Sequence, residues 1–118
     1  MAAKDELGRR GEEVAAASLV AAGFLILDRN WRCQQGEIDI VATDGGETVF
    51  VEVKTRSSLA FGHPLEAITT QKLARLRRLA AAWCVAHPGD HDNIRIDAIA
   101  IISPPIGQPL VEHLRRVF

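Results

Sequence analysis

The stretch GEIDIVATDGGETVFVEVKTR, residues 36–56, decides the fold of this 118-residue chain. Two runs rich in Ile, Val and Thr flank the turn residues 44–46 (Asp-Gly-Gly), a pattern typical of a β-hairpin. Acidic residues interrupt both runs, and Lys54 follows Glu52 by two positions. Residues two apart on a strand share a face, so pairing of the two strands predicts that Asp39 lies within a few ångströms of Glu52.

Two neighbouring carboxylates cost stability unless a cation lies between them. At a separation of about 4 Å they repel by about 1 kcal/mol in water and about 4 kcal/mol at an effective dielectric constant of 20. Carboxylate oxygens are the ligands that Mg²⁺ and Mn²⁺ prefer. Asp39 and Glu52 therefore indicate a metal site, in which Lys54 would hold an attacking water or offset charge on a phosphate. The competing interpretation is an exposed strand with ordinary surface charges.

The rest of the chain predicts an α/β fold around this hairpin. The expected elements are helices over residues 5–22 and from Thr69 or Thr70 to about Ala86, and strands over residues 24–31, 37–43, 48–54 and 94–102. Residues 110–118 fit either a short strand or a helical turn. A hairpin followed by a strand that is entered through a helix predicts a mixed sheet with helices on its faces. The length fits a single domain over residues 1–118.

The first helix offers another carboxylate. At about 100° per residue, its apolar stripe is expected to be centred on Leu7, Val14, Ala15, Ser18 and Ala22, with Leu19 at the edge. Glu12 shares nearly the azimuth of Leu19, so we expect it at the border of the buried face, within reach of the sheet. Glu13 is expected in solvent. A capping or macrodipole role near the helix N-terminus is the alternative for both acids.

The overall composition limits the function classes. A net charge of −1 and a pI of about 6.4 give no indication of nucleic-acid binding, so any basic surface must be local. The charged N-terminus is unlike a secretory signal, and the longest fully apolar run, residues 98–102, is too short to cross a bilayer. Cys33 and Cys84 are expected as free thiols. These features predict a soluble, cytoplasmic protein.

Four segments carry a resemblance to a known family: Gly8-Arg-Arg-Gly-Glu12, Gly36-Glu-Ile-Asp39, Phe50-Val-Glu52-Val-Lys54-Thr-Arg56 and Arg95-Ile-Asp97. They resemble the YraN-like bacterial proteins, which are described as predicted endonucleases. That family is similar to archaeal Holliday junction resolvases and belongs to the restriction-endonuclease-like PD-(D/E)xK superfamily. The resemblance covers nearly the whole chain, from about Gly8 to Ile102.

The resemblance implies a restriction-endonuclease-like mixed sheet of four or five strands, flanked by helices, with a divalent-metal nuclease site. The acidic metal ligands of the superfamily map onto Asp39 and Glu52, its lysine onto Lys54, and the helix acid of the resolvases onto Glu12. Ile38 stands where the superfamily motif has proline. Resolvases act as dimers, so a homodimer is allowed, although no self-complementary patch can be identified in the sequence.

Other residues have two interpretations each. Glu37 is either an outer-sphere metal ligand or a partner for one of three arginines, Arg29, Arg32 or Arg56. Asp97 either pairs with Arg95 on the surface or lies near the centre of the sheet, as a second candidate for a role behind the metal ligands. Lys72 either extends along the apolar side of its helix or reaches the acidic cluster. A zinc site at Cys84, His87 and His91 is disfavoured, because structural zinc normally has four protein ligands.

The favoured hypothesis is a Mg²⁺- or Mn²⁺-dependent endonuclease, a deoxyribonuclease that acts on structured or branched DNA. Its catalytic residues would be Glu12, Asp39, Glu52 and Lys54. Contacts to the DNA backbone are assigned to Arg32, Arg56, Lys72 and Arg75. The alternative is a non-catalytic module of the same fold that binds nucleic acid or a protein partner.

Overall fold

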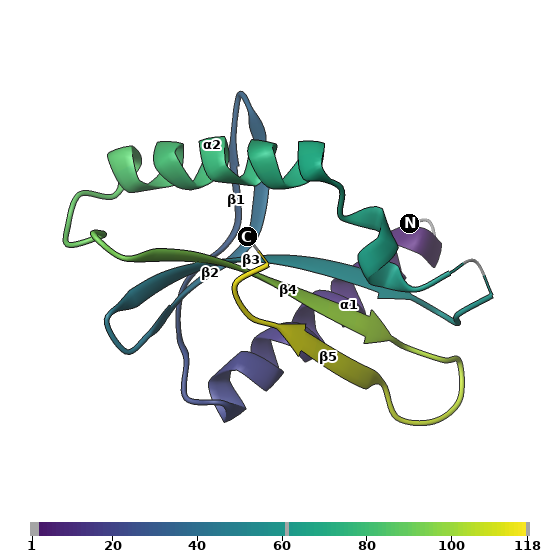
Figure 1. Ribbon diagram of the computed structural model, residues 1–118. Helices are drawn as coiled ribbons and strands as arrows, with labels where there is room; N and C mark the ends of the chain where they lie inside the picture. Colours follow the sequence, from purple (N-terminus) through teal and green to yellow (C-terminus); the bar gives the residue numbers. More distant parts are fainter. Residues whose placement is uncertain (1–2, 61, 118) are drawn as a thin grey trace.

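The β-hairpin forms at the predicted place and lies in the middle of the sheet (Figure 1). The computed structural model describes residues 3–60 and 62–117. Strands β2 (Gly36–Asp44) and β3 (Glu47–Arg56) are antiparallel, with Asp44 paired to Glu47 across a two-residue turn. Gly45 in this turn has a φ of +62°, a conformation that glycine adopts without steric cost.

Five strands make one mixed sheet in the order β1-β2-β3-β4-β5. The flanking strands are β1 (Leu25–Cys33), β4 (Ile94–Ile102) and β5 (Leu110–Leu114). β3 and β4 are parallel and are connected through a 3₁₀ turn, η1 (Pro64–Ala67), and helix α2 (Thr70–Ala86), whereas the other neighbouring strands are antiparallel. The α/β class and the mixed sheet are thus confirmed, and the C-terminal segment that fitted two interpretations forms a strand.

The two helices cover opposite faces of the sheet. Helix α1 (Ala3–Ala21) lies below the sheet in the view of Figure 1 and α2 lies above it. The α1-side core consists of Ala15, Ala16, Leu19, Phe24, Ile40, Ala42, Val49, Val51, Val53, Ile99 and Ile101. The α2-side core consists of Ile38, Val41, Phe50, Leu76, Leu79, Ala80, Trp83 and Ile96. The alternating valines of β3, Val49, Val51 and Val53, therefore all face α1.

The buried residues of α2 are Leu76, Leu79, Ala80 and Trp83, whereas the apolar stripe of α1 is rotated from its predicted position. Helix α2 begins after Thr69, whose hydroxyl accepts a hydrogen bond from the Lys72 backbone, as expected for an N-cap. On α1, Leu19 is fully buried although it was placed at the edge of the stripe. Ala22, which was placed near the centre, lies just beyond the end of α1 and is exposed. Within the described residues, no helix has the length and apolar character that a membrane span requires.

Candidate metal centre

Asp39 lies where β2 separates from β3. The regular pairing of these strands ends at Ile40 and Val51. One residue further along β2, the Asp39 carboxylate takes over the position of a backbone acceptor: its Oδ2 accepts a hydrogen bond of 2.8 Å from the Val53 amide. The side chain that was expected to carry the chemistry is therefore held just beyond the last regular pair of the two strands.

The alternation of β2 breaks at this point. Strict alternation predicted that Ile38 and Ile40 share one face while Asp39 and Val41 share the other. The structure shows that this is wrong, because Ile40 belongs to the α1-side core and Ile38 and Val41 belong to the α2-side core. Asp39 and Ile40 both face α1. The irregularity directs the Asp39 carboxylate toward the helix that carries Glu12.

Three carboxylates converge on one point. Oxygen atoms of Glu12, Glu37 and Asp39 all lie within 4.8 Å of one another. Glu12 is half-buried against the sheet, and its neighbour Glu13 has a side chain that is 71% exposed and pairs with Arg29 at 2.9 Å. The azimuths read from the helix therefore distinguish the two acids correctly. Glu37 contributes more directly to the cluster than the sequence suggests, and it also pairs with Arg32 at 2.6 Å.

Glu52 and Lys54 lie beside these three acids. Glu52 is only 8% exposed, and its Oε1 is 3.3 Å from Nζ of Lys54. The expected ligand pair was Asp39 and Glu52, whereas the group of three acids found among the described residues is Glu12, Glu37 and Asp39. Glu52 is nevertheless close enough for its charge to raise the pKa of Asp39.

The electrostatics of the cluster favour a cation. Burial, and then the charge of Glu52, raises the pKa of Asp39 from its ordinary 3.8 to about 7, against the hydrogen bond from Val53. Burial also raises the pKa of Glu12, although a hydrogen bond from the Asn30 side chain opposes this. Both shifts have the direction expected when several carboxylates are crowded together without a counter-ion.

The donor set fits a small divalent cation. All the donors are carboxylate oxygens, which suit Mg²⁺ and Mn²⁺ better than softer metals. Two oxygens bound to one Mg²⁺ at about 2.1 Å are at most about 4.2 Å apart. The observed limit of 4.8 Å for Glu12, Glu37 and Asp39 is therefore close to what one ion requires.

Asn30 contacts this cluster and was missed by the sequence analysis. Its side-chain amide acts on the Glu12 carboxylate and lowers the pKa of Glu12. It lies within β1 and has a φ of 54°. Asparagine is one of the few non-glycine residues that adopt this conformation readily, so a lone Asn inside a strand was the available signal, and it is a weak one.

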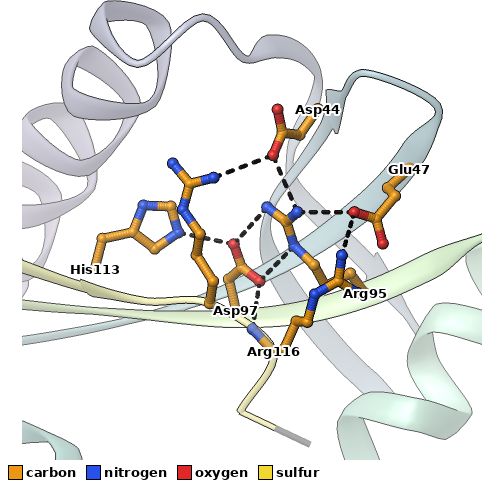
Figure 2. A network of polar contacts seen from close by, with 7 residues as sticks. Asp44, Glu47, Arg95, Asp97, His113 and Arg116 are labelled. Carbon is orange, nitrogen blue, oxygen red and sulfur yellow. Dashed lines mark hydrogen bonds and ion pairs between the residues drawn. The ribbon is translucent and has the colours of Figure 1, made fainter.

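Asp97 belongs to a different polar network, which Figure 2 shows. It is fully buried, and its carboxylate accepts hydrogen bonds from the Arg95 guanidinium at 2.9 and 3.0 Å, from His113 Nε2 at 2.7 Å and from the Arg116 backbone at 3.0 Å. Arg95 extends the network to Asp44 and Glu47 beside the hairpin turn. The proposed role of Asp97 behind the metal ligands is therefore corrected, because both of its oxygens are occupied in this network.

The remaining candidates are four basic residues and a disfavoured zinc site. Arg32 is 78% exposed in its side chain and is held by Glu37, and Arg56 donates to the Thr55 carbonyl. Lys72 is half-buried and Arg75 is exposed, in the first half of α2. At the disfavoured zinc site, His87 Nδ1 donates to the Trp83 carbonyl and His91 Nε2 to the His87 carbonyl. These rings are therefore engaged by the backbone.

Gly11 allows α1 to approach β3 closely next to Glu12. A Cβ built at Gly11 would overlap the Thr55 hydroxyl and lie 2.8 Å from Thr55 Cβ, whereas a Cβ at Gly8, one turn earlier, would meet nothing within 4 Å. We expect Gly11→Ala to lower the free energy of unfolding by about 1–3 kcal/mol. Gly8→Ala is the matched control and should raise it by about 0.5–1 kcal/mol, because Ala favours the helix. Urea denaturation measures both, and equal effects would show that α1 can move away from the sheet.

A family model described as "Uncharacterised protein family UPF0102" matches residues 11–101. The chain belongs to this family. The match confirms the YraN-like resemblance, and it runs from α1 to β4, so it includes all five residues Glu12, Glu37, Asp39, Glu52 and Lys54. UPF0102 is uncharacterised, so membership assigns no activity to the acidic cluster.

Relatives within UPF0102 match over almost their whole length. A UPF0102 protein of Arthrobacter sp. (strain FB24) is 59% identical over 117 residues, which cover 99% of both chains. A UPF0102 protein of Beutenbergia cavernae is 56% identical over 117 residues, again 99% of both chains. A UPF0102 protein of Clavibacter michiganensis subsp. michiganensis is 53% identical over 115 residues, 98% of both chains.

Proposed function

We propose that this UPF0102 protein is a Mg²⁺- or Mn²⁺-dependent endonuclease that hydrolyses phosphodiester bonds in structured or branched DNA. The observation that carries the proposal is the convergence of Glu12, Glu37 and Asp39 at the end of the β2–β3 pairing, with the ion pair of Glu52 and Lys54 beside them. A sheet that needed only a polar edge would not gather acids that raise one another's pKa values.

Each group has a role in this proposal. Asp39, Glu12 and Glu37 would hold the ion, and Glu52, the other ligand expected from the motif, would hold it directly or through a water. A bound Mg²⁺ or Mn²⁺ supplies a Lewis acid and lowers the pKa of a bound water. Lys54 would orient the water that attacks phosphorus in line, while the bond to the leaving oxygen breaks. Its ammonium group would also offset the charge that develops on the phosphate.

The DNA would be held through its phosphates. Arg32, Arg56, Lys72 and Arg75 are the candidate contacts, from β1, β3 and α2. Phosphate contacts position a duplex without reading its sequence. Binding should therefore weaken steeply as the salt concentration rises and should depend little on base sequence.

The decisive experiment is cleavage of a labelled four-way DNA junction in the presence of Mn²⁺, with linear duplex and single strand of the same sequence for comparison. The wild type should cut, and Asp39→Asn or Glu52→Gln should each lower the rate at least 100-fold, because each removes a charge from the metal site. Glu13→Gln is the matched control on α1, since Glu13 points away from the cluster, and it should retain the rate.

The outcomes of this experiment separate the alternatives. Cleavage that survives both substitutions would identify a contaminating nuclease. If the wild type binds the junction tightly but does not cleave it in Mn²⁺ or Mg²⁺, the proposed endonuclease activity would be contradicted. A non-catalytic module that binds nucleic acid would then be favoured.

A further inference from the structure

Asn30 has an unusual backbone conformation for a strand residue. Its φ is 54°, in the left-handed region, although it lies inside β1. The other described non-glycine residue with a positive φ is Arg116, which follows the last strand. Side-chain-bearing residues in this region carry a steric cost, and such residues concentrate at functional sites. The position of Asn30 relative to the acidic cluster is therefore of interest.

Asn30 lies level with Asp39. The pairs between β1 and β2 include Arg29 with Ile40 and Trp31 with Ile38, so Asn30 and Asp39 occupy the level between them. The residue of β1 with a positive φ and the residue at which β2 changes face are thus neighbours across the two strands.

The same break in alternation occurs on β1. Asp28 faces α2, because its carboxylate accepts a hydrogen bond from Trp83, and Trp31 packs against the α2-side core. Between them, Arg29 faces α1, because it binds Glu13, and Asn30 lies opposite Asp39, whose carboxylate gathers with Glu12 of α1. Two consecutive residues of β1 therefore point toward α1.

The two breaks match each other. On β2, Asp39 and Ile40 are the consecutive residues that face α1, at the same two levels as Asn30 and Arg29. Because Asn30 has a left-handed backbone, the side chains of β1 change face at the same level as those of β2. The strands can then stay paired on both sides of this level, at Arg29 with Ile40 and at Trp31 with Ile38. Without this change, the orientation of Val41 would place Asp39 on the α2 face, away from Glu12.

We propose that Asn30 is a positioning residue of the metal centre, whose backbone turns Asp39 toward α1 and whose side-chain amide holds the Glu12 carboxylate beside it. This inference rests on the proposed metal site. An ionised carboxylate can only accept hydrogen bonds, so the amide of Asn30 donates to Glu12. Asparagine suits both tasks, since it tolerates a positive φ and carries the donor.

The two tasks can be separated by substitution in the full-length chain. Asn30→Gly removes the amide but keeps the backbone conformation, because glycine adopts a positive φ without cost. Asn30→Ala removes the amide and also penalises the conformation. Glu12→Gln and the double variant Asn30→Gly with Glu12→Gln test whether Asn30 acts through Glu12. The probe is Mn²⁺ alone, titrated by calorimetry at pH 8, together with the melting temperature of each metal-free protein.

We expect Asn30→Gly to keep the melting temperature and to weaken Mn²⁺ binding about tenfold, as is typical for partners of metal ligands. Asn30→Ala should weaken binding at least as much and should also melt at a lower temperature than Asn30→Gly. In the Glu12→Gln background, Asn30→Gly should have little further effect on Mn²⁺ affinity, because its partner is already altered.

Three results would overturn the inference while leaving the metal site intact. The first is that Asn30→Gly binds Mn²⁺ as tightly as the wild type. The second is that Asn30→Gly lowers the Mn²⁺ affinity of Glu12→Gln by the same factor as it lowers that of the wild type. The third is that Asn30→Gly and Asn30→Ala have equal melting temperatures. A wild-type chain that fails to bind Mn²⁺ would instead reject the proposed function itself, and with it the role of Asn30.

Discussion

Replacement of Asp97 by alanine is expected to lower the free energy of unfolding by about 3–5 kcal/mol, the usual cost of removing one partner from a buried ion pair. The Arg95 side chain is only 4% exposed, and Asp97 takes both its Nε and one of its terminal nitrogens. The variant would leave this guanidinium without its closest counter-charge in the interior. The charge cannot be lost by deprotonation, because arginine stays protonated in proteins.

The same substitution should loosen the C-terminal edge of the sheet. Figure 2 shows that His113 of β5 and the backbone of Arg116 converge on the Asp97 carboxylate from the yellow end of the chain. These contacts hold the segment after β5 across β4, where the Val117 amide also donates to the Ile96 carbonyl. Hydrogen exchange at Arg116 and Val117 should therefore accelerate more than exchange in β2 and β3.

A double variant provides the control. Arg95→Met with Asp97→Leu removes both charges and keeps apolar volume, so it should be clearly more stable than Asp97→Ala alone. Denaturation in urea at pH 7 measures each variant. If the single and double variants lose the same stability, the cost comes from the tail contacts of His113 and Arg116 and not from the buried charge of Arg95.

The hairpin and the order of the elements were predictable because their signals are local. Alternating Val residues and the Gly45–Gly46 turn specify β3 and its pairing with β2 from adjacent positions alone. The nature of the C-terminal segment was not predictable in this way. β5 is a strand whose His113 and following Arg116 bind Asp97, 16 and 19 residues earlier in the chain.

The rotation of α1 has a different cause. The expected stripe counted apolar side chains, and Gly11 has none. Its missing side chain is what allows this side of α1 to contact Thr55 of β3. The close approach at Gly11 turns Leu19 into the core, an effect that a count of apolar residues cannot anticipate. Ala22 is exposed because it lies beyond the end of the helix.

The candidate site was predictable in its residues but not in its detailed grouping. The motif predicts Asp39 near Glu52, and the charge of Glu52 does raise the pKa of Asp39, one residue beyond the last regular pair of β2 and β3. It does not predict that oxygens of Glu12, Glu37 and Asp39 form a group within 4.8 Å of one another. That grouping depends on the break in alternation at Asp39 and Asn30, and strict two-residue periodicity excludes such a break by assumption.

Asp39→Asn is expected to stabilise the metal-free protein at pH 8 by about 2 kcal/mol. Burial and the neighbouring Glu52 raise the pKa of Asp39 from 3.8 to about 7, so the fold resists the charge that this group carries at pH 8. The full shift corresponds to about 4 kcal/mol at about 1.4 kcal/mol per pKa unit. The expected gain in stability is smaller, because the remaining carboxylates of the cluster still repel one another. The asparagine oxygen can still accept the hydrogen bond from Val53.

The gain should depend on pH in a defined direction. Between pH 3.8 and about 7, Asp39 loses its proton in the unfolded chain but retains it in the folded chain. The folded state then binds more protons, so the stability of the wild type falls as the pH rises through this range. The Asp39→Asn variant does not lose stability in this way, because asparagine does not titrate. The two proteins should therefore be nearly equal in stability near pH 4 and should diverge up to about pH 7.

Mn²⁺ should reverse this order at pH 8. A metal that binds only the folded state stabilises it by about 2.7 kcal/mol at 100 times its dissociation constant, and the wild type should gain this whereas Asp39→Asn should gain much less. Melting temperatures with and without Mn²⁺, from pH 4 to 8, measure both effects, with Glu13→Gln as the exposed control that should follow the wild type. If metal-free Asp39→Asn is less stable than the wild type at pH 8, the carboxylate is already well compensated by groups such as Lys54. The crowding of charge that makes this cluster a metal centre would then be absent.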